Sequence, residues 1–290
     1  MGTLYLVATP LGNLEDLSPR AVRVLRNVSL IAAEDTRHTG KLLRHFGITT
    51  PVISYHAFNE RARRKRLLRA LQDGDVALVS DAGTPGISDP GRDLVEAAAA
   101  AGFSVTVIPG PSAVTAAAAV SGLVEGPFVF LGFLPRAATQ RRRLILRADA
   151  TGFPLVLFEA PTRTASTLRE LAELLGHRRA VVARELTKLH EEIRRGTLDA
   201  LAQDLAAQEV RGEVAIVVES RPEEQASEES PEDLALRLLR TGMKPSQAAK
   251  EMAAILGIAR SAAYQIVRQA QTHIHHSPTS LVREDYPPEG

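Results

Sequence analysis

The stretch from Asp75 to Gly91, DVALVSDAGTPGISDPG, constrains the fold of this 290-residue chain more than any other. It opens with four consecutive apolar residues, Val76 to Val79, which predict a strand buried on both faces. Three glycines and two prolines follow between Gly83 and Gly91, so this segment cannot lie inside a helix or a strand. A helical pattern begins after Arg92. Because ligands of open α/β sheets bind where such loops leave the carboxyl ends of strands, we expect this long, stiff loop to bind a ligand.

The same order of strand, loop and helix recurs along the first half of the chain. Apolar runs predict five strands, at residues 3–8, 30–33, 52–56, 76–79 and 103–108. Continuous apolar runs are typical of strands covered on both faces, so we predict an α/β fold with a mostly parallel sheet. A second α/β lobe is predicted from strands at residues 127–134, 155–160, 180–186, 191–196 and 213–219. The two lobes are expected to enclose a cleft.

We expect five segments: a first α/β lobe over residues 1–123, a second over 124–219, an acidic linker over 220–231, a helical unit over 232–271 and a tail over 272–290. The linker, SRPEEQASEESP, holds no large apolar residue and cannot pack a core. The helical unit has short helices separated by turns that contain glycine, an arrangement that resembles a helix-turn-helix. A three-helix dimerisation module is an alternative that periodicity leaves open.

Composition excludes several classes of protein. The chain has no cysteine, which excludes disulfides, thiolate metal sites and a cysteine nucleophile. The N-terminus does not resemble a signal peptide, and no apolar run approaches the ~20 residues that span a bilayer, so we expect a cytoplasmic protein that does not engage a membrane. The net charge of +1 is uninformative, but basic residues gather at 61–69 and 141–143. These runs favour a polyanionic partner over the alternative of a solvated helix face.

The common nucleotide and metal fingerprints are missing. There is no G-x-G-x-x-G after the first strand and no Walker A sequence, and the zinc-protease pattern that begins at His190 fails because Arg194 stands where a histidine is needed. We therefore expect no metal site. What remains is a set of loops at strand ends, at residues 9–13, 34–38, 80–91, 109–113 and 159–163. Their backbone amides, hydroxyls and carboxylates suit a nucleoside-like ligand.

Eight segments, taken in order, resemble one family, the bacterial 16S ribosomal RNA cytidine 2′-O-methyltransferases of the tetrapyrrole-methylase-like class of S-adenosylmethionine enzymes. The segments are VATPLGN (7–13), AEDTRHT (33–39), SYHAFNE (54–60), SDAGTPGISDPG (80–91), PGPSA (109–113), GFLPR (132–136), FEAPTR (158–163) and ARELTK (183–188). The resemblance covers the chain to about Glu219, and the C-terminal unit also resembles the helical appendage of these enzymes. Gly86 and Ser88 depart from the family pattern, which leaves the side-chain contacts of their loop open.

The resemblance implies that S-adenosylmethionine binds in the cleft between the lobes. It places Gly83, Pro85, Ile87, Ser112 and Ala113 along this methyl donor, with Pro10 on the acceptor side. The carboxylate of Asp81 would favour binding of the cationic sulfonium.

A ribose hydroxyl is a poor nucleophile, so a general base would help methyl transfer. The candidates are Glu34, Asp35, Glu159, Glu185 and Lys188, and the sequence does not choose among them. RNA-binding candidates are Arg37, Arg141, Arg142, Arg143, Arg163 and Arg184. An ordinary structural ion pair is the alternative for each of these side chains.

The expected function is S-adenosylmethionine-dependent 2′-O-methylation of a cytidine in 16S ribosomal RNA, by a homodimer that acts on the RNA or on the small ribosomal subunit. One alternative is a methyltransferase of the same fold that acts on a tetrapyrrole or another small molecule, although such a substrate would need neither the basic runs nor the helical unit. Another is a non-catalytic regulator that binds nucleic acid through the helical unit, although it would not need the elaborate loops.

Overall fold

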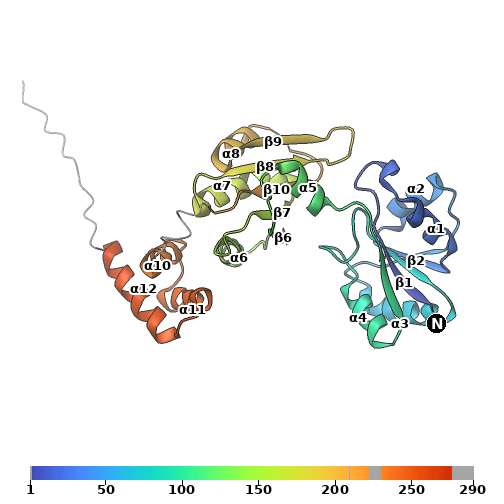
Figure 1. Cartoon of the computed structure of the whole chain (residues 1–290), viewed down its shortest axis with the longest axis horizontal. Helices are drawn as coiled ribbons and strands as arrows, with labels where there is room; N and C mark the ends of the chain where they lie inside the picture. The colour runs from blue at the N-terminus through green and yellow to red at the C-terminus, as the bar shows by residue number, and fades with distance from the viewer. Residues whose placement is uncertain (1, 209, 222–229, 276–290) are drawn as a thin grey trace, which may run out of the picture. The chain divides into compact units, whose positions relative to one another are not determined.

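The computed structural model describes residues 2–208, 210–221 and 230–275 (Figure 1). Packing divides the chain into two compact units. The first, here called the sheet unit, comprises the chain up to Pro135 together with Phe153–Ser220. The second, here called the helix unit, comprises Arg136–Gly152 together with the chain from Arg221 onward.

The first sheet of the sheet unit is wholly parallel, as predicted. Its strands are β1 (Thr3–Val7), β2 (Leu30–Ala33), β3 (Val52–Ser54), β4 (Val76–Val79) and β5 (Ser104–Ile108), in the order β3-β2-β4-β1-β5. Strand β4 is the central strand, and all four of its residues are buried. The loop over residues 80–91 therefore starts from the middle of the carboxyl edge of the sheet.

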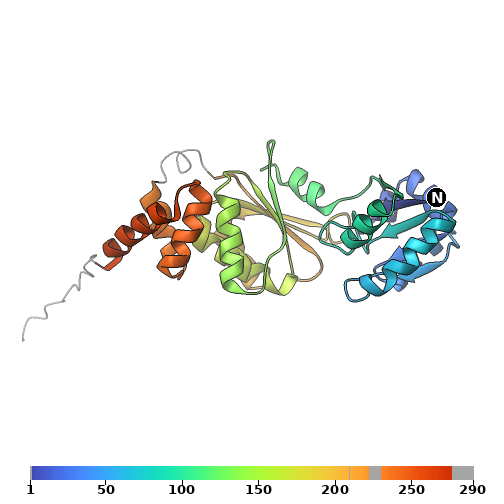
Figure 2. The same cartoon turned by 90° about the horizontal axis from the view of Figure 1, so that it is seen from below.

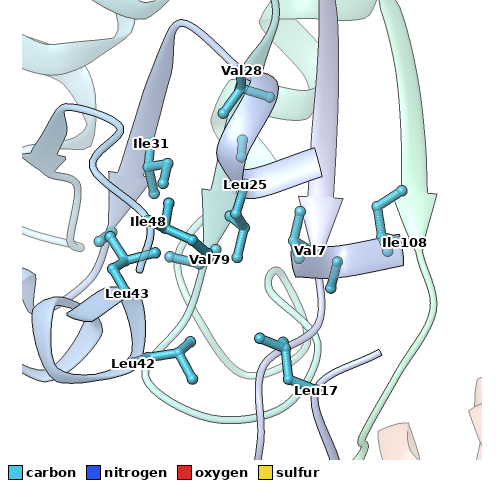
Figure 3. Close-up of a cluster of buried hydrophobic side chains, with 13 residues drawn as sticks. Val7, Leu17, Leu25, Val28, Ile31, Leu42, Leu43, Ile48, Val79 and Ile108 are labelled. Carbon is cyan, nitrogen blue, oxygen red and sulfur yellow. The ribbon is translucent and has the colours of Figure 1, made fainter. Parts of the chain in front are cut away.

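Helices cover both faces of this sheet. Ala77 and Val79 pack on one side with α1 (Pro19–Asn27) and α2 (Thr36–His45), in the cluster drawn in Figure 3. Val76 and Leu78 pack on the other side with α3 (Glu60–Asp73) and α4 (Arg92–Ala100). Since alternate residues of a strand point to opposite faces, this arrangement explains why β4 has a continuous apolar sequence.

The second sheet is mixed. Its strands are β6 (Val129–Phe133), β7 (Leu155–Glu159), β8 (Arg179–Arg184), β9 (Glu192–Thr197) and β10 (Val214–Val218), in the order β6-β7-β10-β8-β9. Only β6 and β7 pair in parallel. Helices α7 (Thr164–Leu175) and α8 (Leu198–Ala206) pack against each other, and α8 contacts β8 and β9.

Helix α5 (Ala113–Ser121) differs from the sequence-based division, which placed residues 1–123 in the first lobe. Its buried residues Val114, Ala117 and Ala118 pack against Val156 of β7 and Val217 of β10, and so cover the second sheet. An alanine-rich helix has no polar face to leave in water, so it is covered by the nearest apolar surface. The chain thus crosses from the first sheet to the second between β5 and α5.

The helix unit contains α6 (Ala138–Asp149), α10 (Pro231–Arg240), α11 (Pro245–Leu256) and α12 (Arg260–His275). The last three lie side by side in orange and red in Figure 2. The sequence pattern predicts α6 in the second lobe and an end of the helical unit at residue 271; instead, α6 joins the helix unit and α12 extends to His275. His273 and His275 therefore belong to a helix, and His276 lies outside the described residues.

Ion pairs explain why α6 belongs to this unit. Glu251 of α11 is 5% exposed, and its carboxylate lies 2.8 Å from Nε of Arg143 and 3.6 Å from Nε of Arg147, both on α6. Arg237 of α10 lies 3.6 Å from the buried carboxylate of Asp149 at the end of α6. Such long-range pairs are not visible in local sequence patterns.

We expect Glu251→Ala to destabilise the helix unit by about 1–3 kcal/mol. Removing one partner of a fully buried charge pair costs about 3–5 kcal/mol, and the cost here is lower because the two arginines are half exposed and regain water. Hydrogen exchange of the α11 and α12 amides measures the change. The matched control is Lys250→Ala, at the exposed neighbouring position. Equal exchange in the two variants would show that the pair does not stabilise the unit.

Candidate functional site

Three loops meet at the carboxyl edge of the first sheet. Thr9 and Gly83 exchange two backbone hydrogen bonds, of 2.9 and 3.0 Å. The Thr9 hydroxyl donates to the carbonyl of Ser80 over 3.1 Å, and the Thr84 hydroxyl donates to the carbonyl of Pro111 over 3.4 Å. The loops at residues 9–13, 80–91 and 109–113, each singled out from the sequence, are therefore held together by direct bonds.

Backbone strain concentrates in the β4–α4 loop and in the loop between β8 and β9. Gly91 has a φ of +142°, and a Cβ atom there would lie 2.8 Å from Cδ2 of Leu78. Three non-glycine residues of the described chain have a positive φ, namely Ser88 (63°), Glu185 (53°) and Thr187 (66°). Ser88 lies in the β4–α4 loop, and the other two lie in the loop between β8 and β9. Strained conformations of this kind persist where the surrounding structure holds them, and they cluster at functional sites.

The loops surround a cavity of about 380 Å³, here called the inter-sheet cavity. Residues from the carboxyl edge of the first sheet form one part of its wall, and residues of the second sheet and its loops form the rest. Phe133 and Phe158 contribute aromatic surface, with ring centroids 5.6 Å apart. Ala113, at the start of α5, contributes a small side chain. The cavity thus combines apolar surface with several carboxylates, as small-molecule sites do.

Most of the residues that the sequence assigned to the methyl donor line this cavity. They are Asp81, Gly83, Ile87, Ser112 and Ala113. Pro10 and Pro85 are buried and do not line it, whereas their neighbours Leu11 and Thr84 do. Phe133, Phe158 and Glu213 also line the cavity and are not predicted from the sequence, although the two phenylalanines belong to the motifs GFLPR and FEAPTR.

Carboxylates crowd the first-sheet side of the cavity. Oδ1 of Asp81 accepts the backbone N–H of Asp35 over 3.0 Å. Burial, together with the nearby charge of Asp81, raises the pKa of Glu34. Burial and the charge of Glu34 raise the pKa of Asp89 to about 6. These like charges in a partly buried site favour the binding of a cation.

Glu159, a catalytic candidate, is held firmly in the wall. The residue is 2% exposed, and its carboxylate accepts the N–H of Ala160 over 2.8 Å and the hydroxyl of Thr167 over 2.6 Å. Nη1 of Arg163, an RNA-binding candidate, lies 3.5 Å away. Both side chains are thus committed to each other and to the start of α7.

Glu185 and Lys188, the other catalytic candidates, form a pair outside the lining of the cavity. Nζ of Lys188 lies 2.7 Å from Oε1 of Glu185, which also accepts the N–H of Glu213 over 2.9 Å. Burial raises the pKa of Glu185, but these hydrogen bonds outweigh burial and hold the pKa below its usual value. Lys188 also packs on Gly12, where an added Cβ would overlap its side chain. The pair therefore joins the β8–β9 loop to the first loop of the chain.

The remaining RNA-binding candidates belong to different elements of the two units. Arg37 has a 92% exposed side chain, and Arg184 binds Glu192 over 2.9 Å. Arg143 binds Glu251 in the helix unit, where Arg141 and Arg142 also belong to α6. Their role in RNA binding stays a prediction.

Two classes of feature are not found in the described residues. They contain no group of three or more histidine, aspartate or glutamate side chains that could hold a metal ion. Within the same ranges, no helix combines the length and the apolar character needed to cross a membrane.

The chain is similar to one family model and to several curated proteins. The family model of the tetrapyrrole (corrin/porphyrin) methylases matches residues 3–202. A Synechocystis protein named ribosomal RNA small subunit methyltransferase I is 48% identical over 271 residues, which cover 92% of this chain and 97% of the relative. A Thermotoga maritima protein of the same name is 45% identical over 222 residues, which cover 76% of this chain and all of the relative.

Solved structures share the fold at lower identity. A diphthine synthase aligns with a TM-score of 0.60 at 17% identity, over 76% of this chain and 90% of its own. The uroporphyrin-III C-methyltransferase of Thermus thermophilus, in complex with S-adenosylhomocysteine, aligns with a TM-score of 0.52 at 20% identity, over 75% of this chain and 97% of its own. With a family model that spans most of the sheet unit and relatives that match nearly the whole chain, this protein belongs to the tetrapyrrole (corrin/porphyrin) methylase family.

Proposed function

We propose that this protein transfers a methyl group from S-adenosylmethionine to the 2′-hydroxyl of a cytidine in 16S ribosomal RNA. The observation that carries the proposal is the near full-length similarity to relatives named ribosomal RNA small subunit methyltransferase I. The sequence resemblance supplies the finer statement that the target is a cytidine ribose. A tetrapyrrole or another small molecule is the alternative substrate, and it draws support from the fold alone.

The residues of the inter-sheet cavity fit S-adenosylmethionine. Phe133, Phe158 and Ile87 offer apolar surface to an adenosyl group, and the small Gly83 and Ala113 leave room for it. When bound there, the donor supplies an electrophilic methyl group on a sulfonium, whose positive charge is complementary to the carboxylate of Asp81. The bonds between the Thr9 and Gly83 backbones fix the wall in advance, which favours alignment of the reacting groups.

Helix α3 offers a surface that suits RNA. Arg61, Lys65, Arg66 and Arg69 are exposed on it, and none of these four forms an ion pair with a described residue. Arg61, Lys65 and Arg69 are spaced four residues apart and therefore lie along one face. Two contacts attach the helix to the β4–α4 region: Glu60 accepts the N–H of Gly91 over 3.0 Å, and Arg64 binds Asp93 over 2.9 Å. The basic row is thus fixed to the loop that lines the cavity.

The relative from Thermotoga maritima is shorter than this chain: its whole length aligns with 76% of the chain, and it carries the same name as the longer relatives. We infer that the sheet unit, which contains the inter-sheet cavity, holds the chemistry and that the helix unit serves RNA binding. The expected homodimer, the cytoplasmic location, and the choice between free RNA and the assembled small subunit stay predictions.

Ala113→Phe tests the donor site. A phenylalanine at this position fills the cavity, so we expect the affinity for S-adenosylmethionine in calorimetry to fall at least tenfold, which corresponds to about 1.4 kcal/mol. Ala119→Phe is the matched control, because it makes the same change at an exposed position of α5. Unchanged affinity in Ala113→Phe would place the donor elsewhere.

Transfer of a labelled methyl group tests the acceptor. We expect label in 16S ribosomal RNA or small subunits that lack the modification, and nucleoside analysis should recover it as 2′-O-methylcytidine. Label on a tetrapyrrole and none on RNA would favour the alternative. Donor binding without transfer to either substrate would count against both enzymatic functions.

Replacing Arg61, Lys65 and Arg69 with glutamine tests the basic row. We expect RNA affinity to fall and the slope of its salt dependence to decrease by about three, because each cation lost releases about one counterion fewer. Donor affinity should not change. The control replaces Arg20, Arg23 and Lys41, exposed on α1 and α2, and removes the same net charge. Equal losses in both triple variants would indicate a net-charge effect rather than a docking surface.

A further inference from the structure

Most of the carboxylates at the inter-sheet cavity are already engaged by hydrogen-bond donors or cations. Asp81 accepts the backbone N–H of Asp35, and Glu34 accepts the backbone N–H of Asp81. Glu159 accepts two hydrogen bonds in the wall, and Glu213 lies 3.4 Å from Nζ of Lys188.

Asp89 differs from these acids. Among the described residues, neither a cation nor a backbone N–H binds it, and the hydroxyl of Ser80 is its hydrogen-bonding neighbour. A carboxylate without a charged partner is free to accept a proton from a bound molecule. Of the acids that line the cavity, Asp89 is therefore the one whose carboxylate can most readily accept a proton.

The position of Asp89 points to a particular role. A second cavity of about 580 Å³, here called the acidic hollow, lies beside the first. All of its lining residues lie between Glu34 and Glu96, in the part of the sheet unit that contains the first sheet. Three residues, Glu34, Ser88 and Asp89, line both cavities. Asp89 thus lies in the shared wall, where a molecule in the hollow and one in the inter-sheet cavity would come closest. The strained backbone of Ser88, with its φ of 63°, directly precedes it.

We propose that the acidic hollow receives the acceptor nucleoside and that Asp89 is the general base that takes the proton from its 2′-hydroxyl. This inference rests on the proposed function and adds the site and the residue to it. Carboxylates are also suitable partners for the exocyclic amino group of cytosine, which is a hydrogen-bond donor. Glu34 in the same hollow could meet that group, whereas Glu96 is paired with Arg92.

The proposed step is balanced. The O–H bond of the ribose hydroxyl and the S–CH₃ bond of the donor break, an O–CH₃ bond forms, and the sulfonium leaves as a neutral thioether. The proton moves to an Oδ atom of Asp89 and is later released to water. No oxidant, reductant or metal ion is required.

The electrostatic environment suits a base. Burial, together with the negative charges of Glu34, Asp81 and Glu213, raises the pKa of Asp89 to about 6. Arg92 also lines the hollow, but its guanidinium is paired with Glu96 over 2.8 Å. A raised pKa makes the carboxylate more basic, while leaving it mainly ionised at neutral pH. Because the base must be ionised, the rate should rise with pH through the region near 6. The apparent value belongs to the coupled group that includes Glu34.

Asp89→Asn provides a test that does not depend on activity. The raised pKa means that ionised Asp89 destabilises the folded protein at pH 8, whereas below pH ~4 the carboxyl is protonated in both the folded and unfolded states. The variant should therefore unfold at a higher temperature than the wild type at pH 8, and the difference should vanish below pH ~4. Calorimetry should show donor affinity within about threefold of wild type. A lower unfolding temperature at pH 8, or lost donor affinity, would assign Asp89 to structure or to donor binding and overturn the proposal.

Kinetics complete the test. We expect Asp89→Asn to lower kcat by about 10²–10⁴-fold, the usual contribution of a general base, and to abolish the rise near pH 6. Asp16→Asn, the same change at an exposed position that lines neither cavity, should keep the wild-type rate and pH profile. A wild-type protein that transfers no methyl group to 16S RNA would overturn the proposed function, and this inference with it. An active wild type with an equally active Asp89→Asn would overturn this inference alone.

Discussion

The pair of backbone hydrogen bonds between Thr9 and Gly83 is the contact on which the site depends. It joins the loop after β1 to the loop after β4, and these two strands are neighbours in the middle of the first sheet. Together with the hydrogen bond from the Thr84 hydroxyl to the Pro111 carbonyl, it holds together three loops that are far apart in the sequence. A binding wall made largely of backbone keeps its shape when it is empty, so little binding energy is spent on ordering it.

The same loops carry an electrostatic arrangement that folding alone would not favour. Glu34, Asp81 and Asp89 approach one another at the edge of the first sheet, and the pKa values of Glu34 and Asp89 are raised by burial and mutual repulsion. Other acids of the sheet unit sit beside cations, as Asp93 does with Arg64 and Glu192 does with Arg184. The contrast supports the proposal that the acids near Asp89 are functional, because an unfavourable cluster is retained where binding or catalysis requires it.

Features encoded within one short segment could be predicted from the sequence. The apolar run of residues 76–79 predicts the strand β4, and the glycines and prolines after it predict the loop that follows. Ser18 and Pro19 predict the start of α1. Features that depend on distant partners could not be predicted. The place of α6 in the helix unit depends on the ion pair between Arg143 and Glu251. The raised pKa of Asp89 depends on Glu34 and Glu213, which lie next to other strands, β2 and β10.

Members of the family share a fold and differ in substrate, so we expect specificity to lie outside the inter-sheet cavity, where we propose that the methyl donor binds. This chain has two features beyond that cavity: the exposed basic row of α3 and the acidic hollow beside it. Their charges are opposite, and a nucleic acid needs both, because phosphates require cations while the amino group of cytosine requires an acceptor. Glu60 links the two features, since it begins α3, lines the hollow and accepts the N–H of Gly91. A strand of RNA held by its phosphates along α3 could therefore present one nucleoside to the hollow while its backbone stays clear of the carboxylates.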